Sequence, residues 1–267
     1  MSKKIILSAD DFGRNPYRNK AIDEAFSKDY IKSAALIVNS PYSIEAINLA
    51  TRGGGYIKHI HCHFNFTGGL YTDYKAISLS MRANNEWTDG EKFRVQKQLQ
   101  YGEIDTIDSV KMVDIFYDEM VAKYELFMKL TGGKANCNHV DFHCWYNLSW
   151  PIALALRDFS IRFKIKTVRI IGCHQESNPV MQILASIGLA NGVKAYRSCN
   201  IDFYLSNLES LKNEEIMELY VHPDYYNSPL MDNSVSSYGH PKRLLETQIS
   251  DLLQKAKDIE FISWTEV

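Results

Sequence analysis

The chain has 267 residues, enough for one sizeable domain that buries about 75% of its extended surface and needs no disulfide or structural metal for stability. Its 30 lysines and arginines against 32 aspartates and glutamates give a formal net charge of −2. That balance argues against nucleic acid or an anionic membrane as a partner, and a small neutral substrate fits it better.

Five cysteines, an odd number without a CxxC pair, argue against a disulfide framework or a zinc knuckle and favour reduced thiols. Lys3 and Lys4 precede only three apolar residues, too few for the core of a signal peptide. No apolar run is long enough to cross a bilayer. We therefore expect a cytoplasmic protein, and the sequence leaves a monomer and a homodimer equally open.

The first predicted strand ends in two adjacent carboxylates, Asp10 and Asp11, followed by Gly13. Open and closed α/β sheets keep their active sites at such carboxyl ends of strands. Two like charges so close disfavour joint ionisation unless a cation or a donor offsets them, and a divalent metal is the simplest remedy. Adjacent side chains of a regular strand face opposite ways, so both can act together only if the backbone bends here. The alternative is that one aspartate caps a helix that begins near Asn15 while the other is solvated.

Alternating strand and helix patterns occupy the rest of the chain. Short runs that are apolar on at least alternate positions predict strands at residues 33–38, 56–63, 137–143, 167–171, 218–222 and 260–264. Apolar residues at spacings of three and four predict helices over 113–127, ended by Gly132 and Gly133, and over 245–256.

This alternation predicts a single α/β domain over residues 1–267, with a mainly parallel sheet closed or nearly closed as a barrel. Residues 64–105 are rich in Gly, Asn, Thr and aromatic residues and are too long for an ordinary connection. We interpret them as an active-site lid or a substrate wall.

Histidines gather at the predicted strand ends. His61 and His63 are two apart, and so are His139, Asp141 and His143, which places each set on one face of its strand. His59, His139 and His174 fit buried core histidines better than ligands. The strand-terminal set of His63, His143 and His222 converges with Asp11 if the strands form one sheet. Three of these groups would give an Asp-His-His site suited to zinc or another divalent metal.

The chain resembles the YdjC-like carbohydrate deacetylases, which include chitooligosaccharide deacetylases. Four blocks carry the resemblance, in the family's order and rough spacing: residues 9–13 (ADDFG), 63–67 (HFNFT, for the HLNLT-like motif), 139–143 (HVDFH, for HxDSH) and 221–223 (VHP, for HPG). The resemblance implies a distorted (β/α) TIM-like barrel. It also implies hydrolysis of an N-acetyl group from an acetylated amino sugar or oligosaccharide, with a water on one divalent metal ion as nucleophile.

The resemblance also assigns residues. It implies Asp11, His63 and His143 as metal ligands, Asp10 as general base and His222 as general acid. Arg169 resembles a family arginine that could orient the catalytic carboxylate. The ion could be zinc or magnesium, and manganese, cobalt or nickel also suit these ligands.

Some positions depart from the family pattern. Trp145 and Asn147 stand where histidine is common, His61 stands where the family tends to have glycine, and Asp224 replaces the glycine of HPG. Two alternatives therefore stay open: a hydrolase of another amide or of a phosphoester on the same barrel, and a non-catalytic carbohydrate-binding relative.

Overall fold

The computed structural model describes residues 3–66, 106–143, 150–169, 194–197, 215–223 and 259–267, together with Ile183 and Gln254. All eight strands in these ranges belong to one sheet, and the pairings between them are parallel. They are β1 (Lys3–Phe12), β2 (Ser33–Leu36), β3 (Ile60–Phe64), β4 (His139–Phe142), β5 (Thr167–Val168), β6 (Lys194–Arg197), β7 (Ile216–Val221) and β8 (Ile259–Ile262).

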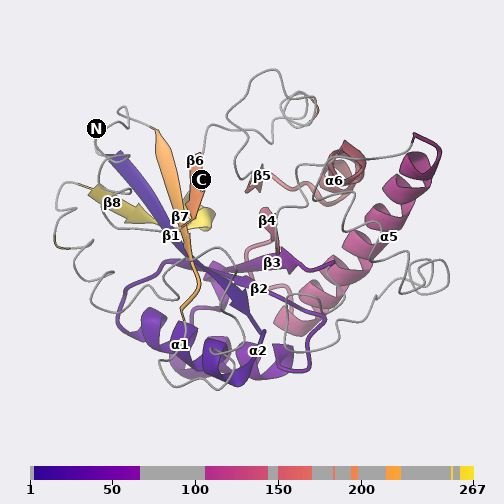
Figure 1. The fold of residues 1–267 in the computed structure, drawn as a ribbon. Coiled ribbons are helices and arrows are strands. Elements are labelled where there is room, and N and C mark those ends of the chain that lie inside the picture. Colours follow the sequence, from indigo (N-terminus) through magenta and orange to yellow (C-terminus); the bar gives the residue numbers. More distant parts are fainter. Residues whose placement is uncertain are drawn as a thin grey trace, which may run out of the picture.

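The strand order is β5-β4-β3-β2-β1-β7-β6, and β8 pairs with β1. Residues 4–6 of β1 lie between β7 and β8, whereas residues 8 and 9 lie between β7 and β2. The sheet curls into a half-barrel, so that the ends of distant strands approach one another (Figure 1). The predicted α/β class with a distorted TIM-like barrel is confirmed.

Helices lie on the outside of this curled sheet (Figure 1). Four α-helices are described, α1 (Pro16–Ser27), α2 (Ser43–Thr51), α5 (Thr106–Thr131) and α6 (Trp150–Phe163), with short 3₁₀ turns at Arg52–Gly54, Ile57–His59 and Trp264–Glu266. Helix α1 packs against α2, and α5 packs against α6. Helix α5 contains the predicted 113–127 stripe and ends where Gly132 and Gly133 adopt positive φ angles of 58° and 68°.

Both faces of β1 are buried from Ile5 onward, which explains the uninterrupted apolar run from Ile5 to Leu7. Ile5 and Leu7 belong to the large core between sheet and helices, while Ile6 packs with Ile262 and Trp264 in a smaller cluster. Because successive side chains of a strand point to opposite faces, Ser8 and Asp10 lie on the same face as Ile6. This is the inner face of the curled sheet.

Several predicted strand boundaries are wrong: β2 ends at Leu36 and not at residue 38, β4 begins at His139 and not at 137, and β7 begins at Ile216 and not at 218. The segment Ile57–His59 forms a 3₁₀ turn, in which the amide of His59 donates to the carbonyl of Tyr56 at 2.9 Å, and β3 begins only at Ile60. His59 thus does not share the face of His61 and His63. At the other end, β8 stops at Ile262, and a capping box between Ser263 and Glu266 starts the next turn.

Other predictions fall mainly outside the described residues. The segment 64–105 was predicted as a lid or wall, but Phe64 is the last residue of β3, and Asn65 and Phe66 are buried behind it. Residues 67–105 lie outside the described ranges, as do most of the predicted helix 245–256 and the departures at Trp145, Asn147 and Asp224.

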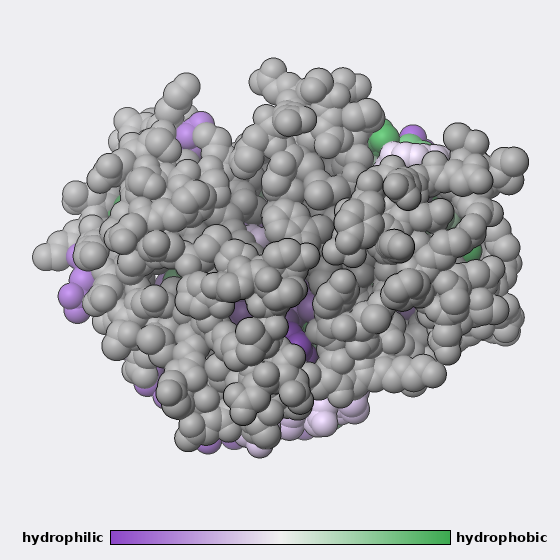
Figure 2. Space-filling view, viewed as in Figure 1, coloured by the Kyte–Doolittle hydropathy of each residue, from purple (hydrophilic) through white to green (hydrophobic). Residues whose placement is uncertain are grey.

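Described residues visible on the face of Figure 2 are mostly hydrophilic, with hydrophobic ones near its edge. Large hydrophobic side chains that are clearly exposed within the described part are few: Tyr17, Ile44, Ile161 and Val267. None of the helices in this part combines the length and the apolar character that crossing a membrane requires. Cys62 and Cys137, the two cysteines in it, are free thiols.

Candidate metal centre

A break in the regular strand brings Asp10 and Asp11 to the same site. The register between β1 and β2 shifts between Ala9 and Phe12, and Asp11 has a φ of 66°. This left-handed backbone costs a non-glycine residue about 1–2 kcal/mol, and such strain persists where the surroundings fix it. The predicted bend is confirmed.

Neither aspartate caps helix α1. Asn15 is the N-cap, and its Oδ1 accepts the amide of Arg18 at 2.8 Å. The alternative that assigned one aspartate to helix capping is therefore wrong. Gly13 follows at a φ of 89°, and its amide donates to Oδ1 of Asn19 at 2.7 Å, which fixes the chain as it leaves the bend.

Asp11, His63 and His143 converge at the carboxyl ends of β1, β3 and β4. Oδ1 of Asp11 lies 2.7 Å from Nδ1 of His143 and 3.4 Å from Nε2 of His63. All three side chains are buried, and one potential ligand atom from each lies within 4.8 Å of the others. Arg14 contacts the other oxygen of Asp11, Oδ2, at 3.2 Å, so that Oδ1 faces the histidines.

These three residues fit a divalent metal ion. Nδ1 of His63 lies 2.6 Å from Oδ1 of Asp141, and this hydrogen bond directs Nε2 toward Asp11. Nε2 of His63 is buried and has no hydrogen-bond partner in the described part of the chain. Nitrogen and oxygen ligands lie about 2.0–2.2 Å from zinc, which puts neighbouring ligand atoms roughly 3–3.5 Å apart. The observed separations are close to that spacing.

Two other groups of potential ligands are less suited to a cation. They are Asp10-His63-Asp141 and His61-His139-Asp141. Both contain Asp141, which lies 2.9 Å from Nη1 of Arg169. A second positive charge so close to a metal ion would repel it. Arg169 pairs with Asp10, Asp141 and Glu218, none of which belongs to the Asp11-His63-His143 group.

Arg169 holds Asp10 from the end of β5. Its Nη1 lies 2.8 Å from both oxygens of Asp10, while Nε and Nη2 form a two-pronged ion pair with Glu218 at 2.7 and 2.5 Å. Glu218 also accepts a hydrogen bond from the indole of Trp264 at 3.1 Å. Burial raises the pKa of Asp10 to about 6, although Arg169 acts in the opposite direction. Asp10 is therefore ionised at neutral pH.

The pKa values of Asp11 and His63 respond to each other's charge. Burial alone would raise the pKa of Asp11, but His143, His63 and Arg14 hold it well below its usual range. Burial would lower the pKa of His63, but Asp141 and Asp11 raise it to about 9. Without a metal, the cluster thus acquires a proton on His63.

The fixed charges leave room for a divalent cation. The site holds four carboxylates (Asp10, Asp11, Asp141 and Glu218) and two guanidiniums (Arg14 and Arg169). With neutral histidines these groups have a net charge of −2. An unbalanced charge of that size is costly in a buried site, and one divalent ion would neutralise it.

His222 lies beside Asp10 at the end of β7. Its Nε2 is 3.9 Å from Oδ2 of Asp10, and its side chain is 31% exposed. The structure therefore brings together the six residues singled out from the sequence: Asp10, Asp11, His63, His143, Arg169 and His222.

Sequence reasoning assigned no role to Asp141, Glu218 or Arg14. For Asp141 the signal was its place between His139 and His143 on one strand face. For Glu218 it was a carboxylate inside an apolar strand, where it is fully buried. Arg14 stands three residues after Asp11, which is within reach across the turn.

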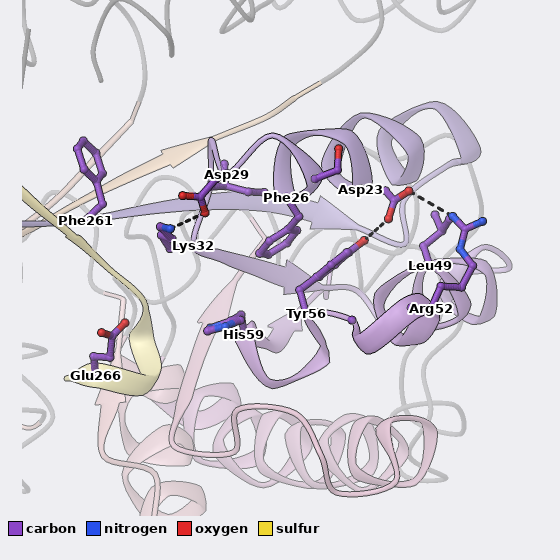
Figure 3. A pocket seen from close by; sticks show the side chains of 14 residues that line it. Asp23, Phe26, Asp29, Lys32, Leu49, Arg52, Tyr56, His59, Phe261 and Glu266 are labelled. Atoms are coloured by element: carbon purple, nitrogen blue, oxygen red, sulfur yellow. Dashed lines mark hydrogen bonds and ion pairs between the residues drawn. The ribbon is translucent and has the colours of Figure 1, made fainter. Parts of the chain in front are cut away.

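A separate cavity of about 700 Å³ lies near the amino-terminal ends of β2 and β3 (Figure 3). Tyr56 stacks on Phe26 there, at 3.9 Å between ring centroids, and its hydroxyl donates to Asp23 at 2.9 Å. None of the six candidate residues lines this cavity. The candidate metal site and the cavity are therefore distinct features of the fold.

A curled parallel α/β sheet with a buried His/Asp cluster at its strand ends defines a TIM-like barrel protein with a candidate metal site. The chain belongs to the YdjC-like protein family, whose model matches residues 4–255. The family resemblance stated from the sequence is confirmed.

A carbohydrate deacetylase of Xenopus laevis is 24% identical in an alignment that covers 85% of this chain and 82% of that protein. Among solved structures, a protein of Enterococcus faecalis V583 with the provisional name cellobiose-phosphate cleavage protein aligns with a TM-score of 0.74. That alignment covers 100% of this chain and 99% of the other at 17% identity, so it bears on the fold alone.

Proposed function

We propose that this protein is a metal-dependent hydrolase that removes an N-acetyl group from an acetylated amino sugar or oligosaccharide. One observation carries the proposal: an ionised, arginine-held Asp10 lies close both to His63 of the Asp11-His63-His143 cluster and to His222. Amide hydrolysis needs a base for water, a cationic centre for the carbonyl and an acid for the amine. Family membership and the name of the Xenopus relative support a carbohydrate substrate.

Asp10 is the proposed general base. Its pKa of about 6 is close enough to neutrality for it to accept a proton from water, and general-base catalysis typically contributes about 10²- to 10⁴-fold in rate. Arg169 holds both oxygens of Asp10, which fixes the direction of the carboxylate. Arg169 is thus a positioning residue in this proposal.

Asp11, His63 and His143 are the proposed ligands of one divalent ion, either zinc or magnesium, with manganese, cobalt and nickel as further candidates. When bound, such an ion polarises a carbonyl and lowers the pKa of a coordinated water from 15.7 toward about 7. Its charge also offsets the repulsion between Asp10 and Asp11.

His222 is the proposed general acid. The amine that leaves an amide is strongly basic and must be protonated as the carbon–nitrogen bond breaks. Histidine suits that task because its ordinary pKa lies near neutrality. The partly exposed position of His222 at the end of β7 leaves its ring accessible to a substrate.

The test is acetate release by the purified chain from N-acetylated mono- and oligosaccharides, alongside its metal content. We expect about one divalent ion per chain and measurable acetate. Asp10→Asn should keep the ion and lose about 10²- to 10⁴-fold in rate, whereas Asp11→Asn should lose the ion as well. Full acetate release by Asp10→Asn would show that Asp10 is not the general base.

The same assay separates the alternatives. Phosphate release from sugar phosphates without acetate release would indicate a different hydrolase on this barrel. Tight sugar binding with no turnover under any metal would indicate a non-catalytic relative. Either result would overturn the proposed deacetylase activity.

A further inference from the structure

His61 has no task in the proposed reaction, yet it contacts the site. It is fully buried on β3, two residues before His63 and on the same strand face. Its Nε2 lies 3.0 Å from Oδ2 of Asp141, and Oδ1 of the same carboxylate lies 2.6 Å from Nδ1 of His63. One carboxylate thus joins two histidines of one strand.

The direction of these hydrogen bonds follows from the carboxylate between them. An ionised carboxylate can only accept, so both rings donate to Asp141. His63 therefore keeps a proton on Nδ1, and its Nε2 faces Asp11 at 3.4 Å. Carboxylates that accept from a histidine in this way set the tautomer and orientation of metal-binding rings.

Two groups donate to Oδ2 of Asp141, His61 and Arg169, and the nitrogen of Arg169 is shared with Asp10. Nη1 of Arg169 approaches that oxygen at 2.9 Å, but the same nitrogen also contacts both oxygens of Asp10. Within the described part of the chain, the side chain of His61 makes one hydrogen bond, to Asp141, and its Nδ1 has no partner there. His61 is thus the donor dedicated to Asp141.

Packing prevents the His61 ring from turning away. Its ring meets the edge of His139, with centroids 4.6 Å apart and planes at 77°. His139 in turn stacks on Trp264 at 3.6 Å and 11°, and its Nδ1 lies 2.8 Å from the hydroxyl of Thr167. A column of buried rings therefore supports the hydrogen bond from His61 to Asp141.

We propose that His61 is a positioning residue of the metal centre, which holds Asp141 so that His63 presents Nε2 to the ion. This inference rests on the Asp11-His63-His143 site proposed above. It gives a structural role to His61, which stands where the family tends to have glycine.

Two substitutions separate the hydrogen bond from the volume of the ring. In His61→Gln, the amide nitrogen can donate to Asp141 from nearly the same place, whereas His61→Leu fills the space without a donor. Zinc affinity of the metal-stripped full chain is measured by competition with a chelator. We expect His61→Leu to bind zinc about 10- to 100-fold more weakly and His61→Gln to stay near wild type.

A second readout needs no metal. The Nδ1 proton of His63 can be followed by NMR in the zinc-free protein. It should remain protected from exchange in wild type and His61→Gln, and exchange faster in His61→Leu. Equal affinities and equal protection in the Gln and Leu variants would overturn the positioning role.

His139→Gln is the matched control, because it removes a neighbouring buried histidine whose hydrogen bond goes to Thr167. Its zinc affinity should fall less than that of His61→Leu, because His139 acts on Asp141 only through its packing against His61. If it loses zinc as strongly as His61→Leu, the ion is held by His61, His139 and Asp141, and the inference is wrong. If wild type binds no divalent ion, the proposed function itself fails, which distinguishes the two failures.

Discussion

Arg169 is surrounded by more negative charge than it can neutralise. It contacts Asp10, Asp141 and Glu218 and is almost fully buried. Breaking a buried ion pair by removing one partner typically costs about 3–5 kcal/mol, because the remaining charge is left uncompensated. The guanidinium therefore serves both the stability of the barrel interior and the direction of the Asp10 carboxylate.

Arg169→Lys should separate these two contributions. Lysine keeps the charge but lacks the planar fork that reaches Glu218 and Asp10 together. We expect the variant to fold and its kcat for acetate release to fall about 10²-fold, since misplacing a catalytic group by about 1 Å costs that much. Kinetics and urea unfolding check both parts. An unchanged kcat would show that Asp10 needs no such support.

The role of His222 can be tested through the leaving group. His222→Gln should lose about 10²- to 10⁴-fold in kcat on an ordinary N-acetyl amino sugar. The loss should shrink on a substrate whose amine is made weakly basic by an electron-withdrawing group, because that amine leaves without protonation. The melting temperature should hardly change, since the ring is partly exposed. An equal loss on both substrates would contradict the acid role.

At the scale of elements, the bend at the end of β1 is the feature on which the site depends. Asp11 takes a left-handed backbone, and Gly13 then passes close to the carbonyl of Ile37. A Cβ at Gly13 would lie 2.7 Å from that oxygen at a φ of 89°. Close approach and positive φ both require glycine at this position.

Gly13→Ala should therefore lower the free energy of unfolding by more than about 2 kcal/mol. Gly132→Ala is the control: its φ is also positive, at 58°, but a Cβ there would meet nothing within 4 Å. We expect a loss of only about 1 kcal/mol for the control. Denaturant unfolding measures both. Equal losses would show that the contact with Ile37 is unimportant.

Much of the site could be predicted because strand geometry is periodic. His63, His143 and His222 were recognised at strand ends, and the β alternation placed Asp141 beside its histidine neighbours. The role of Glu218 could not be predicted, because its ion pair with Arg169 joins residues 49 positions apart on β7 and β5. Only the curl of the sheet brings those strands together.

Local turns were the other feature that could not be predicted from the sequence. The alternating pattern of 56–63 continues through Ile57–His59, although that segment folds as a 3₁₀ turn. The nearby Gly55, with a φ of 25°, brings the backbone so close to the carbonyl of Ala50 that a Cβ would lie 2.2 Å from it. This close approach accompanies two consecutive short turns at Arg52–Gly54 and Ile57–His59, and hydrophobic alternation carries no signal for them.

At the scale of the whole molecule, five strands each deliver a charged or ionisable group to one buried place. The groups come from β1, β3, β4, β5 and β7, or from the residue directly after the strand, in a parallel sheet whose carboxyl ends converge. Because the cluster is short of positive charge, it binds either a proton on His63 or, as we propose, a divalent ion. Metal binding and protonation should therefore compete.

That competition predicts how zinc stabilises the fold at different pH values. In the metal-free protein, the pKa of His63 is raised to about 9 from 6.5, so its contribution to stability is complete below pH 6.5 and is lost as pH rises through 9. Zinc must displace that proton. The increase in unfolding free energy on adding zinc should thus grow by up to about 1.4 kcal/mol per pH unit between 6.5 and 9, then level off.

Comparing zinc-loaded and zinc-free protein at each pH removes the contributions of groups remote from the ion, such as the buried Lys123, whose pKa is lowered by its burial. Urea unfolding at fixed free zinc gives the difference directly. His222→Gln should show the same pH dependence, because that histidine lies outside the proposed ligand set. A zinc effect independent of pH would mean that the ion does not replace the proton on His63, and the ligand assignment would then be wrong.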